Sequence, residues 1–137
     1  MSTRPPIYTR YYDLLGWLLD RLARFPKSSR FGLVQKIEKV ALDNLEILIE
    51  AIYRKDRDVL YGTLNIGLEK LRVFLRLSND RGHLSIEQLR YAVGEIDEIG
   101  RMWHGWTGRP RANQEPGGRA PARRSLGEVG ALSDKVS

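Results

Sequence analysis

Basic side chains gather around one predicted turn near the N-terminus, and their types and spacing fit the binding of phosphate. Arg21 and Arg24 lie one helical turn apart, so their side chains share one face of a helix. Lys27 and Arg30 straddle the expected start of the next helix, whose free N–H groups and positive dipole also favour phosphate. We therefore predict that this cluster contacts a nucleic-acid backbone.

Further basic residues extend this candidate site along later segments. Lys36 and Lys39 follow on the second expected helix, and Arg72 and Arg76 are spaced at four on the third. The alternative for the last two is a set of surface ion pairs with Glu69 or Asp80. The complete set of predicted nucleic-acid-binding residues is Arg21, Arg24, Lys27, Arg30, Lys36, Lys39, Arg72 and Arg76.

The charge balance points in the same direction. The chain has a formal net charge of +6, from 23 basic and 17 acidic residues. Residues 1–57 hold 11 basic and 7 acidic side chains, whereas residues 85–106 hold 2 basic and 4 acidic ones. A basic first half favours polyanionic partners. The alternative is a basic surface that confers only solubility.

Residues for enzyme chemistry are scarce. The chain has no cysteine, which excludes disulfides, thiolate catalysis and cysteine-ligated metals. It has only two histidines, and it contains no phosphate-binding glycine loop and no Gly-x-Ser-x-Gly motif. Glu95 and Glu98 lie one turn apart without a Glu-x-x-His partner, which predicts a solvated or salt-bridged face. We expect neither enzymatic activity nor a cofactor or metal site.

The elements that position these side chains are predicted to be helices, because apolar residues recur at spacings of three and four. The first helix is expected over residues 8–24 and ends before Pro26. The second is expected over 28–54, with Ser28 or Ser29 as N-cap. Its buried face is predicted to hold Val34, Ile37, Ala41, Leu45 or Leu48, Ile49 and Ile52.

The later helices have clearer end signals. A third helix, with Asp56 as its cap, is expected to carry a leucine stripe and to end at Gly82, in the manner of a left-handed C-terminal glycine. Ser85 and Gln88 form a capping box at the start of a fourth helix. The staple positions around this box are occupied by Leu84 and Leu89.

Four helices joined by short connections predict an all-α, antiparallel up-down-up-down four-helix bundle over residues 1–107. Residues 108–137 are rich in glycine, proline and arginine and are expected to form a disordered tail. No run of about 18 apolar residues is present, so we expect no membrane span and a cytoplasmic location.

The apolar surface exceeds what one bundle can bury. A monomer seldom leaves so much of it exposed in one patch, so self-association or a protein partner is expected. The alternative is that lysine and arginine stems cover the excess. The residues that exceed the predicted stripes are Tyr11, Tyr12, Trp17, Phe31, Leu33, Val40, Leu42, Ile66, Val73, Phe74, Leu77, Met102 and Trp106.

Three segments, residues 17–51, 68–89 and 95–106, carry a resemblance to a known family. They include the Phe-Pro-Lys turn at residues 25–27, the Leu-Arg-x-x-x-Arg-Leu run at 71–77 and Glu-Ile-Gly-Arg at 98–101. Together they resemble the four-helix-bundle family of the accessory variability determinant (Avd) proteins of diversity-generating retroelements. This family is related to the intervening-sequence proteins of ribosomal RNA genes.

The resemblance implies a pentameric barrel that associates with the element's reverse transcriptase and its structured template RNA. Such an accessory protein supports mutagenic complementary-DNA synthesis without polymerase activity of its own. By this analogy, the cluster around residues 21–30 faces RNA, and Arg72 and Arg76 face RNA or the polymerase. The alternatives are a bundle of the ribosomal-RNA intervening-sequence type and a protein-interaction module that binds no nucleic acid.

Overall fold

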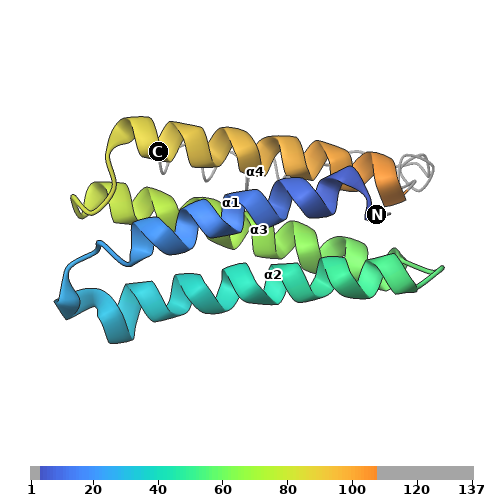
Figure 1. The fold of residues 1–137 in the computed structure, drawn as a ribbon, viewed down its shortest axis with the longest axis horizontal. Coiled ribbons are helices and arrows are strands. Elements are labelled where there is room, and N and C mark those ends of the chain that lie inside the picture. Colours follow the sequence, from blue (N-terminus) through green and yellow to red (C-terminus); the bar gives the residue numbers. More distant parts are fainter. Residues whose placement is uncertain (1–3, 108–137) are drawn as a thin grey trace. The chain divides into compact units, whose positions relative to one another are not determined.

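A computed structural model describes residues 4–107, and this part of the chain is helical, as predicted (Figure 1). The tail predicted at 108–137 lies outside the described residues. Within residues 4–107, every helix is too short or too polar to cross a membrane. The elements are α1 Pro6–Leu22, η1 Lys27–Ser29, η2 Arg30–Val34, α2 Gln35–Tyr53, α3 Asp58–Asp80 and α4 Ile86–Thr107.

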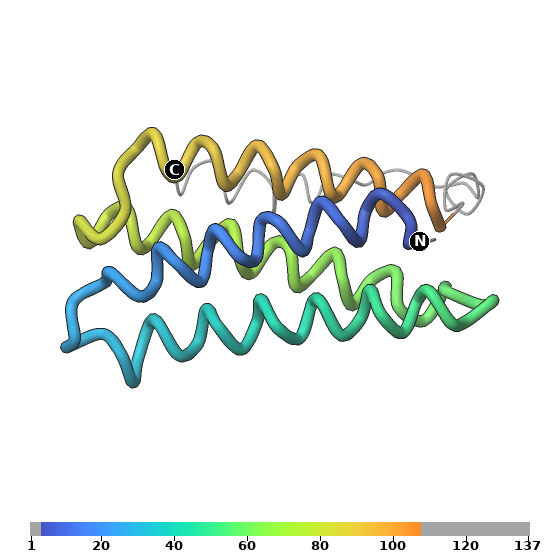
Figure 2. Tube along the Cα trace, viewed as in Figure 1, coloured from blue at the N-terminus to red at the C-terminus, as the bar shows by residue number. Residues whose placement is uncertain are grey.

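The four α-helices run alternately in opposite directions (Figure 2). The α1–α2 and α3–α4 connections therefore lie at one end of the bundle, drawn on the left of Figure 1, and the α2–α3 connection lies at the other. A first compact unit extends to Trp103, and the second begins at His104, so its described part is the last turn of α4. This arrangement agrees with the predicted antiparallel bundle.

Residues at spacings of three and four fill the core of the first unit. The leucine stripe of α3 is buried as predicted, at Leu60, Leu64, Leu68, Leu71 and Leu75. Trp103 of α4 is fully buried, and its Nε1 donates a hydrogen bond to the carbonyl oxygen of Tyr61 over 3.1 Å. Tyr11 and Val40, predicted to exceed the core, are also buried. For these two residues the prediction of excess surface was wrong.

The buried face of α2 differs from the prediction. Ile49 is 40% exposed, and Leu45 and Ile52 are only half-buried. The buried face passes instead through a polar side chain, Asn44, which is 1% exposed. Because the prediction counted only apolar residues as buried, it left out Asn44 and placed the buried face of α2 too far around the helix. The residues that α2 buries are Ile37, Val40, Ala41, Asn44, Leu48 and Ala51.

Asn44 marks a close approach between α2 and α3. A Cβ added to Gly67 of α3 would overlap Asn44 Oδ1 and would lie 2.9 Å from its Cγ. Beside them, the hydroxyl of Tyr11 donates a hydrogen bond to the carbonyl oxygen of Ala41 over 2.6 Å. This contact joins α1 to α2. Glycine at position 67 therefore serves tight helix packing, whereas Gly62 in the same helix has open space around it.

The helix ends predicted at Gly82 and Ser85 are confirmed, whereas the N-cap of α3 is Arg57 and not Asp56, whose Oδ1 accepts the N–H of Asp58 over 3.0 Å. Gly82, after the end of α3, has a φ of 83°. At the start of α4 the capping box is complete, because Ser85 Oγ accepts the backbone N–H of Gln88 and Gln88 Oε1 accepts the backbone N–H of Ser85. The predicted N-cap of the second helix was wrong. Ser29 Oγ donates a hydrogen bond to the carbonyl oxygen of Pro26, and α2 is preceded by a 3-10 turn and a π turn.

Candidate nucleic-acid interface

The connection between α1 and α2 carries an uninterrupted run of positive charge. Residues 21–36, RLARFPKSSRFGLVQK, contain five basic side chains and no acidic one. Phe25, in the middle of the connection, is buried and lies against His83 of the α3–α4 connection, with ring centroids 5.3 Å apart. This contact holds the two connections together at the same end of the bundle (Figure 1).

Four of the predicted residues at this connection project into solvent. Arg24, Lys27, Arg30 and Lys36 are exposed, and none of them forms an ion pair with an acidic side chain in the described part of the chain. Their charges are therefore not neutralised by a neighbouring carboxylate. Such a concentration of one sign raises the local potential and attracts polyanions.

Arg21 is held differently, against the aromatic side chains between α1 and α4. Its Cζ lies 6.0 Å from the centroid of the Trp17 ring, which packs on the ring of Tyr91 at 4.9 Å. Its Nε is buried and has no hydrogen-bond partner among residues 4–107. Arg21 is thus half-buried and oriented by packing on Trp17, one turn before the exposed Arg24.

The structure also brings Arg81 to this end. It is exposed and follows the last residue of α3, in the same connection as His83. Antiparallel helices place the first and third connections side by side, so this proximity could have been predicted from the topology. We call the resulting surface the basic end. It consists of Arg21, Arg24, Lys27, Arg30, Lys36 and Arg81.

The remaining predicted residues lie farther along the helices, and two of them are engaged in ion pairs. Arg72 pairs with Glu69 over 3.0 Å and with Asp97 of α4 over 2.9 Å, so a phosphate at Arg72 would compete with two carboxylates. The pairing of Arg72 with Glu69 agrees with the alternative to nucleic-acid contact, and its second carboxylate partner is Asp97, which the sequence analysis did not name. Lys39 pairs with Asp43 over 3.0 Å.

Arg76 follows Arg72 by one turn of α3. It is half-buried and lies on the same side of the helix as Arg72, toward α4. Arg72 and Arg76 therefore lie on α3, outside the α1–α2 connection, although α3 ends at the same end of the bundle (Figure 1).

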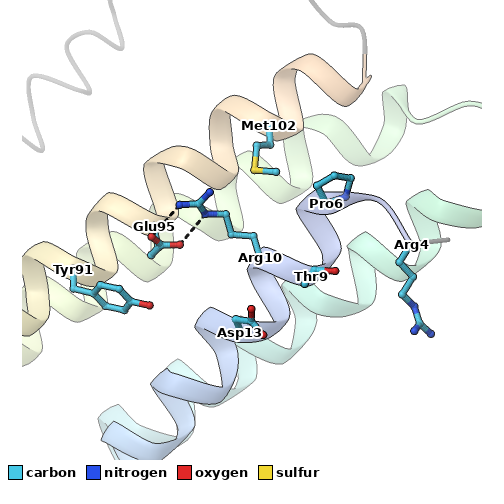
Figure 3. Close-up of a pocket in the computed structure, with 8 residues that line it drawn as sticks. All are labelled: Arg4, Pro6, Thr9, Arg10, Asp13, Tyr91, Glu95 and Met102. Carbon is cyan, nitrogen blue, oxygen red and sulfur yellow. Dashed lines mark hydrogen bonds and ion pairs between the residues drawn. The ribbon is translucent and has the colours of Figure 1, made fainter. Parts of the chain in front are cut away.

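A second surface feature is an open groove between α1 and α4, with a volume of about 650 Å³ (Figure 3). Arg10 crosses it to donate hydrogen bonds to both carboxylate oxygens of Glu95, over 2.9 and 3.2 Å. The hydrogen bond to Glu95 raises the pKa of Arg10 above its ordinary value, which favours the charged guanidinium. The groove is lined by Arg4, Pro6, Thr9, Arg10, Asp13, Tyr91, Glu95 and Met102.

The charged groups of this groove are largely engaged with each other. Two of its charged groups, Arg10 and Glu95, form an ion pair with each other. No group of three or more histidine, cysteine, aspartate or glutamate residues within 4–107 could hold a metal ion. The pairing of Arg101 with Glu98 over 2.7 Å also fits the salt-bridged face predicted for α4.

The structure thus combines a bundle of four α-helices with an exposed group of basic side chains at one end. A family model described as bAvd-like matches residues 7–109, and the chain belongs to this family of bacterial Avd proteins. The Avd family consists of non-catalytic accessory proteins, and membership suggests the accessory protein of a diversity-generating retroelement. A search of curated proteins finds no match.

Proposed function

We propose that this protein binds the structured template RNA of a diversity-generating retroelement through its basic end and delivers it to the element's reverse transcriptase. In this role it supports mutagenic complementary-DNA synthesis. The observation that carries the proposal is the basic end itself, in a chain of the bAvd-like family. Residues 21–36 supply five basic side chains, and no carboxylate within this stretch competes with phosphate.

The exposed apolar residues support contacts with other protein chains. Val59, Ile66, Val73 and Leu77 are 65%, 59%, 47% and 43% exposed, and their spacing of seven, seven and four places them on one face of α3. An aliphatic stripe of this kind is suited to packing against another helix. We assign it to self-association, in a homopentamer, or to the reverse transcriptase.

Binding of the full chain to a structured RNA, followed by fluorescence anisotropy at several salt concentrations, tests the RNA contact. We expect affinity to fall steeply with salt, because each neutralised phosphate contributes about 0.7–0.9 to the logarithmic slope. Arg24→Glu with Arg30→Glu is expected to lower affinity about tenfold or more and to reduce the slope by about 2.

A matched control separates this site from net charge. Lys55→Glu with Lys70→Glu changes the net charge by the same amount, at two exposed residues outside the basic end. This control should retain most of the affinity. Equal losses in the two double variants, or unchanged binding by the Arg24 and Arg30 variant, would remove the basic end from the RNA site and leave the protein-interaction module as the better assignment.

The protein partners require separate measurements. Light scattering during gel filtration is expected to give the mass of five chains. Val73→Glu in the α3 stripe should lower this mass or prevent copurification with the reverse transcriptase, while helicity is retained. A monomeric wild-type chain that fails to copurify with the reverse transcriptase would contradict both assignments.

A further inference from the structure

One aromatic side chain beside the basic end is largely exposed to solvent. Phe31 is 82% exposed, whereas Phe25, six residues earlier, is buried. Phe31 follows Arg30 in the π turn η2, and Gly32 comes next with nothing within 4 Å of the position of a Cβ. The Phe31 ring therefore projects into solvent from a turn that has open space beside Gly32.

The backbone at this point departs from the ordinary helix. The π turn Arg30–Val34 lies directly before α2, and Val34 at its end is buried. π turns are rare and occur frequently at functional sites, because they change the direction of side chains at a cost in helix stability. Here the turn anchors Val34 in the core and leaves Phe31 outside it.

The neighbours of Phe31 indicate what its ring contacts. Arg24, Lys27 and Arg30 lie on the same connection, and none has a carboxylate partner among the residues that the structure describes. An apolar protein partner would have to bury these unpaired charges beside the ring, which is costly. A ligand that combines an aromatic face with negative charge satisfies both the ring and the cations. A nucleotide has this combination.

We propose that Phe31 stacks on an unpaired base of the bound RNA while Lys27 and Arg30 hold the adjacent phosphates. Bases stack on aromatic side chains with little dependence on sequence. In an A-form duplex the bases are already stacked on each other, so only a loop, bulge or single-stranded segment offers such a face. The inference rests on the proposed RNA binding and adds that this end of the protein recognises unpaired nucleotides.

The test compares two RNAs of equal length, a hairpin with an extended loop and a blunt duplex, for binding to the full chain. Phe31→Leu keeps an apolar side chain but removes the ring. It should weaken hairpin binding about five- to a hundredfold, as expected for one stacked base, and leave duplex binding unchanged. Phe31→Trp should retain hairpin affinity. Since Phe31 is exposed, both variants should unfold at the wild-type temperature.

A 2-aminopurine placed in the loop reports stacking directly. Its fluorescence should be quenched by the wild-type chain and by Phe31→Trp but not by Phe31→Leu. The stacking inference would be overturned if Phe31→Leu bound the hairpin as tightly as the wild type, or lost hairpin and duplex equally. It would also be overturned if Phe31→Leu lost only copurification with the reverse transcriptase.

These outcomes are distinguishable from failure of the proposed function. If Arg24→Glu with Arg30→Glu weakens binding and Phe31→Leu does not, phosphate contact at the basic end stands and stacking fails. If the wild-type chain binds neither RNA in a salt-dependent manner, the proposed function and the stacking inference both fail.

Discussion

Replacing Gly67 by alanine should weaken the bundle, although alanine is the better residue in a helix. In an unobstructed helix interior, glycine is about 1 kcal/mol less favourable than alanine. At position 67 the new methyl group would overlap Asn44 Oδ1 and lie 3.3 Å from Asn44 Nδ2. Asn44 is 1% exposed, so its side chain cannot turn out into solvent to relieve the overlap.

The expected magnitude follows from these two opposing contributions. Overpacking a core costs about 1–3 kcal/mol, and values near the upper end apply here because the overlap involves a buried side chain. Subtracting the gain in helix propensity leaves a net destabilisation of about 1–2 kcal/mol. In a domain of this size, that corresponds to a fall in melting temperature of roughly 4–16 °C.

Gly62 supplies the matched control, because it lies in the same helix with nothing within 4 Å of its Cβ position. Gly62→Ala should stabilise the chain by about 0.5–1 kcal/mol, a change of opposite sign. In the Gly67→Ala background, Asn44→Ala should recover part of the loss, since it removes the obstructing amide. A double-mutant cycle measures that coupling.

Urea unfolding followed by circular dichroism, at one fixed chain concentration, gives the free energies of unfolding of the four chains in this cycle: the wild type, Gly67→Ala, Asn44→Ala and the double variant. The fixed concentration matters because self-association makes the apparent stability depend on it. If Gly67→Ala stabilised the chain as much as Gly62→Ala, then α2 and α3 would not approach closely at Asn44, and the packing described for this part of the core would be refuted.

Two further changes probe the same core. Trp103→Ala should cost about 3–5 kcal/mol in urea unfolding, because the side chain is fully buried and donates a hydrogen bond to Tyr61; a loss below about 1 kcal/mol would contradict its core position. Burial raises the pKa of Tyr11 above the ordinary 10.0, so the folded chain keeps the phenol proton where the unfolded chain has lost it. The stability that folding gains from keeping this proton is fully present below about pH 10, and it is lost as the pH rises above that value. Comparing Tyr11→Phe with the wild type at pH 9 and 11 should show a smaller decline in the variant, and equal declines would exclude Tyr11 as the source.

Much of the candidate site could be predicted from the sequence, because most of its basic residues lie close together along the chain. The cations at residues 21–36 are close in sequence, and Pro26 ends the preceding helix, so any fold of this chain keeps them near one turn. The role of Arg72 could not be predicted in the same way. Its partner Asp97 is 25 residues away on another helix, and only the packing of α3 against α4 makes that contact possible.

The sequence by itself determined the helical class, the leucine stripe of α3 and the ends of the helices at Gly82 and Ser85. These features follow from periodicity and from hydrogen bonds between residues a few positions apart, which need no distant partner. The resemblance to the Avd family was also contained in the sequence, and the family model agrees with it.

Only the tertiary structure decided which face of each helix is buried against its neighbours. Ile49 remains 40% exposed while the polar Asn44 is buried, because the position of Gly67 lets α3 approach α2 at that residue. The contact of Phe25 with His83 likewise joins two connections that are far apart in sequence. Burial depends on the neighbouring helices as well as on the side chain itself, and no local pattern within one helix specifies where its neighbours lie.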